Sequence, residues 1–447
     1  MINTLTQSYY SYAGFIEEFF SWYALVGRKV LDVLYTIFDK TFDILLIITV
    51  LVSSMYLIMS IYILFKRRKK DEYTHNGELP FVTVQIPTYN EIVAVRCAQA
   101  CLEFDYPKNK YEILIGDDSN KPEVSDKIAE FAKNHSSIKV IKRESNYGYK
   151  PGNLNNMLKH SKGDIITVFD SDFVPKEDFL RRIVQPFMKD EKIAGVQARW
   201  KFINANQNMI ATLGAAIVII CHHIALSFIY GRKKITLLCG SAEAVRKKTL
   251  IELGGWDNGN LTEDIEFALR LLKNGYNIEY LEDLECDSEV PYTLKDLYRQ
   301  QMRWAYGVTS SWKKHFTSII TSKHLSTSDK LYMQSIFLSG YLITSLLVGL
   351  FVVGTLSFIT HVPEPINWGE FAYKLIRNII LTSGLIIAGV VALAKANKVK
   401  LTLPMLASAF SYGLVVICYV TIGIFKALAK VPMEWYMLNK QGNKTIA

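Results

Sequence analysis

The sequence reads DIITVFDSD from Asp164 to Asp172. The segment Asp164–Phe169 is a short apolar run with β-branched and aromatic side chains, which predicts a buried strand. Two carboxylates, Asp170 and Asp172, follow this strand. Hard oxygen ligands of this kind select Mg²⁺ or Mn²⁺ and leave positions for the phosphates of a substrate. The stretch therefore predicts a strand with a metal site at its carboxyl end.

Short apolar runs alternate with helical stretches between residues 80 and 290. The expected strands are Phe81–Ile86, Tyr111–Gly116, Lys139–Lys142 and Asp164–Phe169, and the expected helices lie around residues 92–104, 123–134 and 151–161. Such alternation predicts an α/β domain with a parallel sheet and helices on both faces. Ligands bind this architecture at the carboxyl ends of the strands.

Polar and acidic residues follow three of the predicted strands. A single acid at a turn is usually a helix cap or part of a solvated loop. Three acidic sites on neighbouring strands instead favour one shared crevice. The residues at these ends are PTYNE (residues 87–91), GDDS (residues 116–119) and DSD (residues 170–172).

Three further motifs carry candidate site residues. In KPGNLN (residues 150–155), Lys150 can meet a phosphate, although an ordinary loop before a helix would look the same. In TED (residues 262–264), the acids also suit the first turn of a helix, and Asp264 is the candidate base for an acceptor hydroxyl. In QMRW (residues 301–304), preceded by Gln300, the tryptophan can stack on a sugar ring and Arg303 can pair with a diphosphate. Tryptophan and arginine are also common membrane-interface anchors.

The composition predicts a membrane protein with a soluble domain. Of 447 residues, 50% are hydrophobic and only 21% are charged, and the mean hydropathy is +0.14. Thr41–Phe65 is the clearest span, and the basic run Lys66–Lys70 that follows it is typical of the cytoplasmic side. The net charge of +9 lies largely in this run and in lysines after residue 394. No nucleic-acid partner is expected, because no basic patch interleaves with aromatics in the soluble block.

Other apolar stretches leave the topology open. Phe15–Phe38 contains five charges and is interpreted as an interfacial amphipathic helix rather than a second span. Met209–Tyr230 is interpreted as a core or surface helix. After the soluble block come Tyr332–Ile359, Leu375–Ala394 and Leu401–Ala429. Three spans would put the C-terminus outside the cell, whereas its lysines favour the cytoplasmic side. Alternatively, the third stretch lies partly in the membrane interface or forms a re-entrant segment.

The motifs together resemble those of the processive family-2 glycosyltransferases, which include cellulose, glucomannan and hyaluronan synthases. The resemblance covers residues 80 to 310 and rests on the ordered set Asp117-Asp118, Asp170-x-Asp172, Thr262-Glu263-Asp264 and Gln300-x-x-Arg303-Trp304. It implies a GT-A (Rossmann-like) catalytic domain on the cytosolic side of a transmembrane helical domain.

The resemblance also implies roles for individual residues. The nucleotide-binding set is Thr88, Tyr89, Glu91, Asp118, Lys150 and Asp170, and the metal, Mg²⁺ or Mn²⁺, is assigned to Asp172 and Asp170. The catalytic set is Asp264, as the base, and Glu263. The set that holds the acceptor and the diphosphate is Gln300, Arg303, Trp304, Cys239, Gly240, Trp435 and Lys440. Trp435 and Lys440 fit the spacing of a gating segment, in which Leu438 stands where relatives carry threonine. A gate at this position must be cytoplasmic, which requires an even number of spans after the catalytic domain.

The implied activity is processive, inverting polymerisation of a β-linked polysaccharide from UDP-glucose or GDP-mannose, with export across the membrane. The partners would be the nucleotide-sugar donor, the growing polysaccharide and the lipid bilayer, with a homo-oligomer possible. Alternatives are a hyaluronan-type synthase, a non-processive transferase to a polyprenyl phosphate, and a transporter with a cytosolic regulatory domain. The predicted segments are 1–40 interfacial, 41–65 transmembrane, 71–290 catalytic, 291–330 interfacial with the QxxRW motif, 332–429 transmembrane or interfacial, and 430–447 gating.

Overall fold

The computed structural model describes residues 2–66, 77–233, 235–361, 367–440 and 442. The chain divides into two compact units. One consists of Met1–Met55 with Ile343–Gly384, and the other of Tyr56–Leu342 with Leu385–Ala447. The predicted segment boundaries follow a different criterion and remain a prediction.

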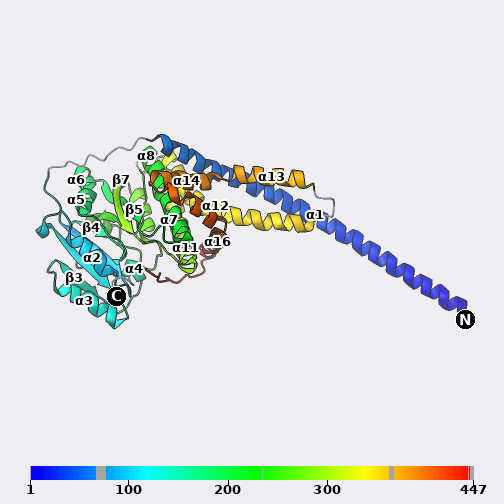
Figure 1. Ribbon diagram of the computed structural model, residues 1–447, viewed down its shortest axis with the longest axis horizontal. Helices are drawn as coiled ribbons and strands as arrows, with labels where there is room; N and C mark the ends of the chain where they lie inside the picture. The colour runs from blue at the N-terminus through cyan, green and yellow to red at the C-terminus, as the bar shows by residue number, and fades with distance from the viewer. Residues whose placement is uncertain (1, 67–76, 234, 362–366, 441, 443–447) are drawn as a thin grey trace. The chain divides into compact units, whose positions relative to one another are not determined.

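The first unit is helical. Helix α1 (Ile2–Phe65) runs without a break through residues 15–38 and 41–65, which were predicted as an interfacial helix and a separate span. Within this unit α1 lies alongside α12 (Thr327–Thr360) and α13 (Trp368–Leu381) (Figure 1). A Cβ on Gly349 or Gly354 of α12 would contact Leu45 or Phe42 of α1, so these small residues allow the two helices to approach closely.

The second unit is built on a mixed sheet. Within the described residues its strands follow the order β3-β2-β1-β4-β6-β5-β7. The strands are β1 (Val82–Thr88), β2 (Tyr111–Asp117), β3 (Ile138–Lys142), β4 (Ile165–Val168), β5 (Ile193–Phe202), β6 (Glu243–Arg246) and β7 (Asn277–Ser288).

The prediction of a parallel sheet is correct for β1 to β4, but it is wrong for β6. Strand β6 runs antiparallel to both of its neighbours, β4 and β5, while β5 and β7 are parallel to each other. A strand of four residues can enter the sheet in either direction, because its short pattern carries no information on the connection before it.

Helices cover the sheet on both faces. The chain moves outward from β1 through α2 (Ala94–Leu102), β2 and α3 (Pro122–Lys133) to β3, and then returns through α4 (Tyr149–Leu158) to β4. Right-handed crossovers therefore place α4 on the face opposite α2 and α3. The strand order reverses between β1 and β4, and this switch point is where ligands bind in such sheets.

The remaining helices of this unit are short pieces around the sheet and longer ones after it. They are α5 (Phe179–Ile183), α6 (Gln185–Lys189), α7 (Met209–Ile220), α8 (Ser227–Lys233), α9 (Lys247–Glu252), α10 (Glu263–Lys273), α11 (Leu294–Ile320), α14 (Gly384–Lys395), α15 (Thr402–Ala409) and α16 (Tyr412–Leu428).

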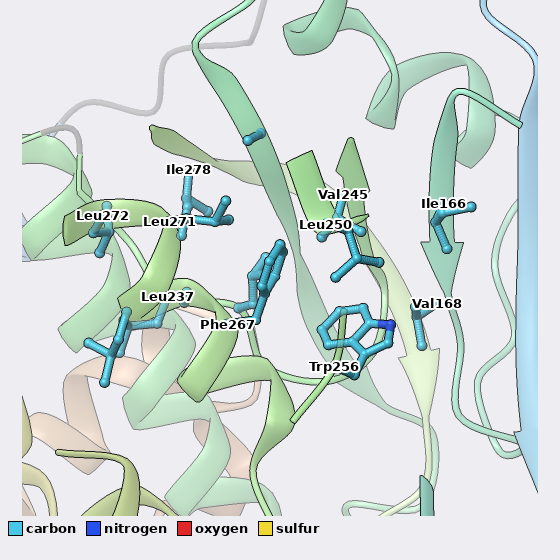
Figure 2. Close-up of a cluster of buried hydrophobic side chains, with 14 of the residues drawn as sticks. Ile166, Val168, Leu237, Val245, Leu250, Trp256, Phe267, Leu271, Leu272 and Ile278 are labelled. Atoms are coloured by element: carbon cyan, nitrogen blue, oxygen red, sulfur yellow. The ribbon is translucent and has the colours of Figure 1, made fainter. Parts of the chain in front are cut away.

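A buried apolar cluster fixes α10 on the sheet. Phe267 and Leu271 of α10 pack in one cluster with Trp256, Val245 of β6 and Ile278 of β7 (Figure 2). The rings of Phe267 and Trp256 meet edge to face, with 5.2 Å between their centroids. This cluster places the N-terminus of α10, and with it the TED motif, beside the carboxyl ends of the strands.

Three helices in the described part of the chain are long and apolar enough to cross a membrane: Glu17–Phe65, Met209–Arg232 and Gly340–Thr360. The count rises to five if each of two bent helix pairs is one span. One of these pairs, Val399–Ala409 with Tyr412–Leu428, bends by 68°. The segment Met209–Arg232 differs from the other two because 67% of its most apolar window is buried in the protein.

Candidate active site

The predicted site residues line one cavity of about 620 Å³ in the second unit, a volume typical of a small-molecule pocket. Its walls come from the carboxyl ends of β1 and β4, the N-termini of α4 and α10, the first half of α11 and the C-terminal segment. The predicted residues in this lining are Thr88, Tyr89, Glu91, Asp118, Lys150, Asp170, Asp172, Cys239, Gly240, Glu263, Asp264, Gln300, Arg303, Trp304, Trp435 and Lys440.

Lys150 is the centre of the charged network in this cavity. Its Nζ atom lies 2.8 Å from Asp170 Oδ1 and 3.1 Å from Glu263 Oε1, and it donates to the Gly240 carbonyl at 2.6 Å. Burial alone would lower the pKa of Lys150, but the nearby carboxylates raise it. Lys150 is therefore a fixed cation at the point where three segments of the chain meet.

Asp264 is a buried acid beside this cation, with 8% of its surface exposed. Burial raises the pKa of Asp264 to about 7, and the neighbouring Glu263 acts in the same direction while Lys150 opposes it. A carboxylate that titrates near neutral pH is suited to accept a proton from a hydroxyl.

Gly240 permits the close approach of the loop before β6 to the acid. Its φ is +84°, a conformation that favours glycine. A Cβ at this position would lie 3.1 Å from Asp264 Oδ2 and 3.3 Å from Lys150 Nζ.

Glu243, which sequence reasoning missed, supports the same loop. Its Oε2 accepts hydrogen bonds from the backbone N–H groups of Cys239 and Gly240, at 3.1 and 2.8 Å. Burial raises the pKa of Glu243 to about 8, and nearby Asp264 contributes to the rise. Glu243 lies in a strand of four residues, and no local pattern marks it as part of a site.

One side of the cavity lies at the ends of β1 and β2. Arg143 Nε donates to Asp118 Oδ1 at 2.7 Å, and Arg143 also donates to Asp118 Oδ2. At the end of β1, Ser171 donates to the carboxylate of Glu91. Burial raises the pKa of Glu91 to about 7. The side chains of Asp118 and Glu91 are thus held by residues that follow β3 and β4.

The C-terminal segment, residues 430–440, crosses this side of the cavity. Lys440 Nζ lies 2.6 Å from Asp172 Oδ1. Trp435 meets Tyr89 edge to face, with 5.9 Å between the ring centroids, and Asn439 Nδ2 donates to Asp296 Oδ2 at 2.9 Å. The ring of Tyr89 and the carboxylate of Asp172 are therefore both in contact with this segment.

Asp170 and Asp172 differ in their surroundings. The side chain of Asp172 is 3% exposed, whereas that of Asp170 is 35% exposed. Asp172 Oδ2 accepts a hydrogen bond from Ser288 Oγ at 3.1 Å. The other carboxylate oxygen, Oδ1, is paired with the ammonium of Lys440. Among the described residues, no group of three or more His, Cys, Asp or Glu side chains is arranged to hold a metal ion. The two aspartates supply hard oxygen ligands that require other groups to complete a metal shell.

Aromatic side chains also line the cavity, and one of them, Trp200, was not among the predicted site residues. Trp200 at the end of β5 is 6.4 Å from Trp304 of α11 and 5.3 Å from His222, measured between ring centroids. Trp200 Nε1 donates to the Ser241 carbonyl at 2.9 Å. Flat aromatic faces of this kind suit the apolar side of a sugar ring. The expected strands did not include β5, so the sequence did not place Trp200 at the site.

Comparison with known proteins identifies the family. The profile described as "Glycosyltransferase like family 2" matches residues 80–307. The chain is 30% identical over 359 residues to glucomannan 4-beta-mannosyltransferase 7 of Arabidopsis thaliana, covering 74% of this chain and 64% of that protein. It is 31% identical over 325 residues to the probable glucomannan 4-beta-mannosyltransferase 9 of Oryza sativa subsp. japonica, covering 69% of this chain and 61% of that protein. The chain thus spans slightly less than two thirds of these curated relatives.

A solved structure shares the fold. The mannosyltransferase PcManGT from Pyrobaculum calidifontis, in complex with GDP-Man and Mn²⁺, superposes with a TM-score of 0.60 and 17% identity. The match covers 90% of this chain and 100% of that one. This likeness supports the GT-A fold, with the mixed sheet of the α/β domain as its core. Because the family profile covers half of the sequence, we conclude that the chain is an enzyme that belongs to glycosyltransferase family 2.

Proposed function

We propose that this enzyme polymerises a β-linked polysaccharide from GDP-mannose or UDP-glucose by repeated inverting transfer. The observation that carries the proposal is the meeting of all predicted motifs in one cavity, which also contains Asp264 beside Lys150 and the two tryptophans Trp200 and Trp304. The mannosyltransferase names of the relatives and the GDP-mannose bound by PcManGT support a mannosyl donor.

The roles proposed for the donor side follow from charge and position. Tyr89, with Thr88, Glu91 and Asp118, would hold the nucleoside at the ends of β1 and β2. Lys150 and Arg303 would meet the diphosphate, because both are partly buried cations in the cavity wall. A divalent ion, Mg²⁺ or Mn²⁺, would be held by Asp170 and Asp172 together with the donor, and would neutralise charge on the departing diphosphate. The Mn²⁺ in PcManGT supports this assignment.

The acceptor chemistry requires one proton transfer. Asp264 would take the proton from the acceptor hydroxyl, whose oxygen then attacks the anomeric carbon as the nucleoside diphosphate leaves. Inversion follows from a single displacement. Glu263 and Lys150 would set the charge beside this base, while Gln300, Trp304, Cys239 and Gly240 would line the terminus of the acceptor.

The C-terminal segment would act as the gate over the donor. Trp435 and Lys440 both lie in the cavity wall. Lys440 supplies a positive charge at Asp172, the position proposed for the metal, so its ammonium would move toward the diphosphate when a metal binds. The contact of Lys440 with Asp172 supports a gating role for this segment even though Leu438 stands where relatives carry threonine.

The membrane arrangement is also a proposal. The catalytic unit would face the cytoplasm, because the basic run at Lys66–Lys70 follows the strongest apolar segment. The product would cross the membrane among several spans. Protease treatment of sealed inside-out and right-side-out vesicles tests the orientation. Cleavage within residues 77–330 is expected only in the inside-out vesicles.

A donor panel tests the proposed function. Purified membranes are incubated with GDP-mannose, UDP-glucose and other UDP- and GDP-sugars, each with Mg²⁺ or Mn²⁺, and the product is digested with linkage-specific hydrolases. A long product that β-mannanase or β-glucanase degrades is the expected result. A single sugar on a polyprenyl phosphate, or a product sensitive only to hyaluronidase, would favour the alternatives.

A further inference from the structure

One face of α11 contacts the segment that carries the catalytic motif. Arg303, Gly307, Ser311 and His315 are spaced four residues apart, so they lie along one inclined ridge of the helix, where each contacts the next. We refer to these four residues as the α11 seam. Three intervals of four residues span about 18 Å at 1.5 Å per residue. The seam therefore extends from the acceptor motif at Arg303–Trp304 to beyond the first turn of α10.

The upper part of the seam holds the loop before α10. Arg303 donates to the carbonyl of Leu261 at 3.2 Å. Ser311 Oγ lies 3.4 Å from Thr262 Oγ1 and accepts from Asn260 Nδ2 at 3.3 Å. These contacts reach the three residues that precede Glu263 and Asp264.

Gly307 is the closest point between the two segments. A Cβ at this position would lie 2.5 Å from Thr262 Cγ2 and 2.7 Å from Thr262 Oγ1. Such distances are too short for non-bonded atoms, so any larger residue would displace Thr262 or α11. Thr262 is the residue before the first turn of α10, and its displacement would move Asp264 as well.

The lower part of the seam is a buried charge network. Glu266, which is fully buried, accepts from His315 Nε2 at 2.8 Å, Lys314 at 3.1 Å and Arg270 at 2.8 Å. His315 Nδ1 lies 3.3 Å from Lys273 Nζ. The lysine can only donate, so Nδ1 accepts and Nε2 carries the hydrogen that Glu266 receives. A buried carboxylate with this set of partners has one low-energy position.

We infer that Gly307, Ser311 and His315 are positioning residues, which hold the first turn of α10 in register with α11 so that Asp264 faces the acceptor motif. The inference rests on the proposed function, since it assumes that Asp264 is the base and that Gln300–Trp304 lines the acceptor. It assigns Gly307, Ser311 and His315 a role in transfer and none in holding the nucleoside, because Tyr89 and Asp118, which are proposed to hold it, directly follow β1 and β2.

The primary test is Gly307→Ala, measured beside wild type for kcat and KM of sugar transfer and for the Kd of GDP and UDP. A misplaced base lowers kcat by about 10- to 100-fold, while the Kd values stay within twofold. The matched control is Gly340→Ala, because Gly340 is also helical and has open space at its Cβ position. This control should transfer at the wild-type rate.

Second-site rescue separates positioning from general damage. Thr262→Ser in the Gly307→Ala background removes the methyl carbon that the new Cβ would meet, and should restore kcat at least tenfold. At the lower end of the seam, His315→Gln keeps a donor for Glu266 and should exceed His315→Ala in kcat by a similar factor.

The inference is overturned if Gly307→Ala retains wild-type kcat, if the Thr262→Ser exchange restores nothing, or if nucleotide binding is lost in parallel with kcat. Failure of the proposed function looks different: the wild-type protein itself would then transfer no sugar from any donor of the panel. The two failures are therefore distinguished in the same assay.

Discussion

Asp264 illustrates how burial sets the chemistry of a single residue. A solvated aspartate has a pKa of about 4 and is a weak base. In this cavity, removal of water and the negative charge of Glu263 raise the pKa of Asp264 to about 7, against the effect of Lys150. Lys150 also donates a hydrogen bond to the carbonyl of Gly240, in the loop that lies against Asp264. The proposed base and its electrostatic environment are therefore one structural unit.

This environment predicts the pH dependence of transfer. Asp264 must be deprotonated to act as the base, so kcat/KM should rise about tenfold per pH unit below pH 7 and level off above it. A pH–rate profile between pH 5 and pH 9 at saturating metal measures this. A profile that is flat across pH 7, or one that falls as pH rises through 7, would contradict the role assigned to Asp264.

At the level of elements, α10 matters because it joins the core to the site. Its apolar face enters the cluster with Trp256, Val245 and Ile278, and its first turn carries Glu263 and Asp264. The position of the base is thus a consequence of packing several residues away.

Truncation of the core residue of α10 should therefore be costly. Phe267 is fully buried, so Phe267→Ala is expected to lower the free energy of unfolding by about 3–5 kcal/mol. Phe267→Leu, which fills most of the same space, should cost less than about 1.5 kcal/mol. Chemical denaturation of the purified protein in detergent measures both. Equal losses for the two variants would show that the ring does not support α10 as described.

The C-terminal segment is the second element with a specific consequence. Lys440 is the cation that faces the buried carboxylate of Asp172. In EDTA, Lys440→Met should lower the free energy of unfolding by about 1–3 kcal/mol, because the carboxylate loses a charged partner. Added Mn²⁺ should then raise the melting temperature of this variant more than that of wild type.

Lys430→Met provides the control for this experiment, since Lys430 is an exposed lysine of the same segment. It should behave as wild type with and without Mn²⁺. An unchanged response of Lys440→Met to Mn²⁺ would argue against a metal position at Asp172.

At the scale of the whole molecule, the sequence predicted those elements whose pattern lies within a few consecutive residues. Four parallel strands were predicted as short runs that end in turns, and acids follow three of them, so the crevice could be placed from the sequence. The resemblance then supplied Trp435 and Lys440, which lie more than 250 residues from Asp172 in sequence and would otherwise have no visible link to it.

The rest depends on contacts between distant segments. The antiparallel β6 and its buried Glu243 occupy only four residues, which is too short for a periodic signal. The role of Trp200 depends on its distance to Trp304 and His222, and the close approach of Gly307 to Thr262 depends on how α10 packs on α11. No pattern within either segment contains that information.

The proposed sugar transfer depends on Asp264 as its base, while other residues bind the donor. The most direct test measures Asp264→Asn for polymer formation and for the Kd of GDP and UDP, with Asp178→Asn at an exposed position as the control. No polymer is expected from Asp264→Asn, with nucleotide binding within twofold of wild type and full activity in the control. Polymer synthesis by Asp264→Asn at a rate near that of wild type would contradict it.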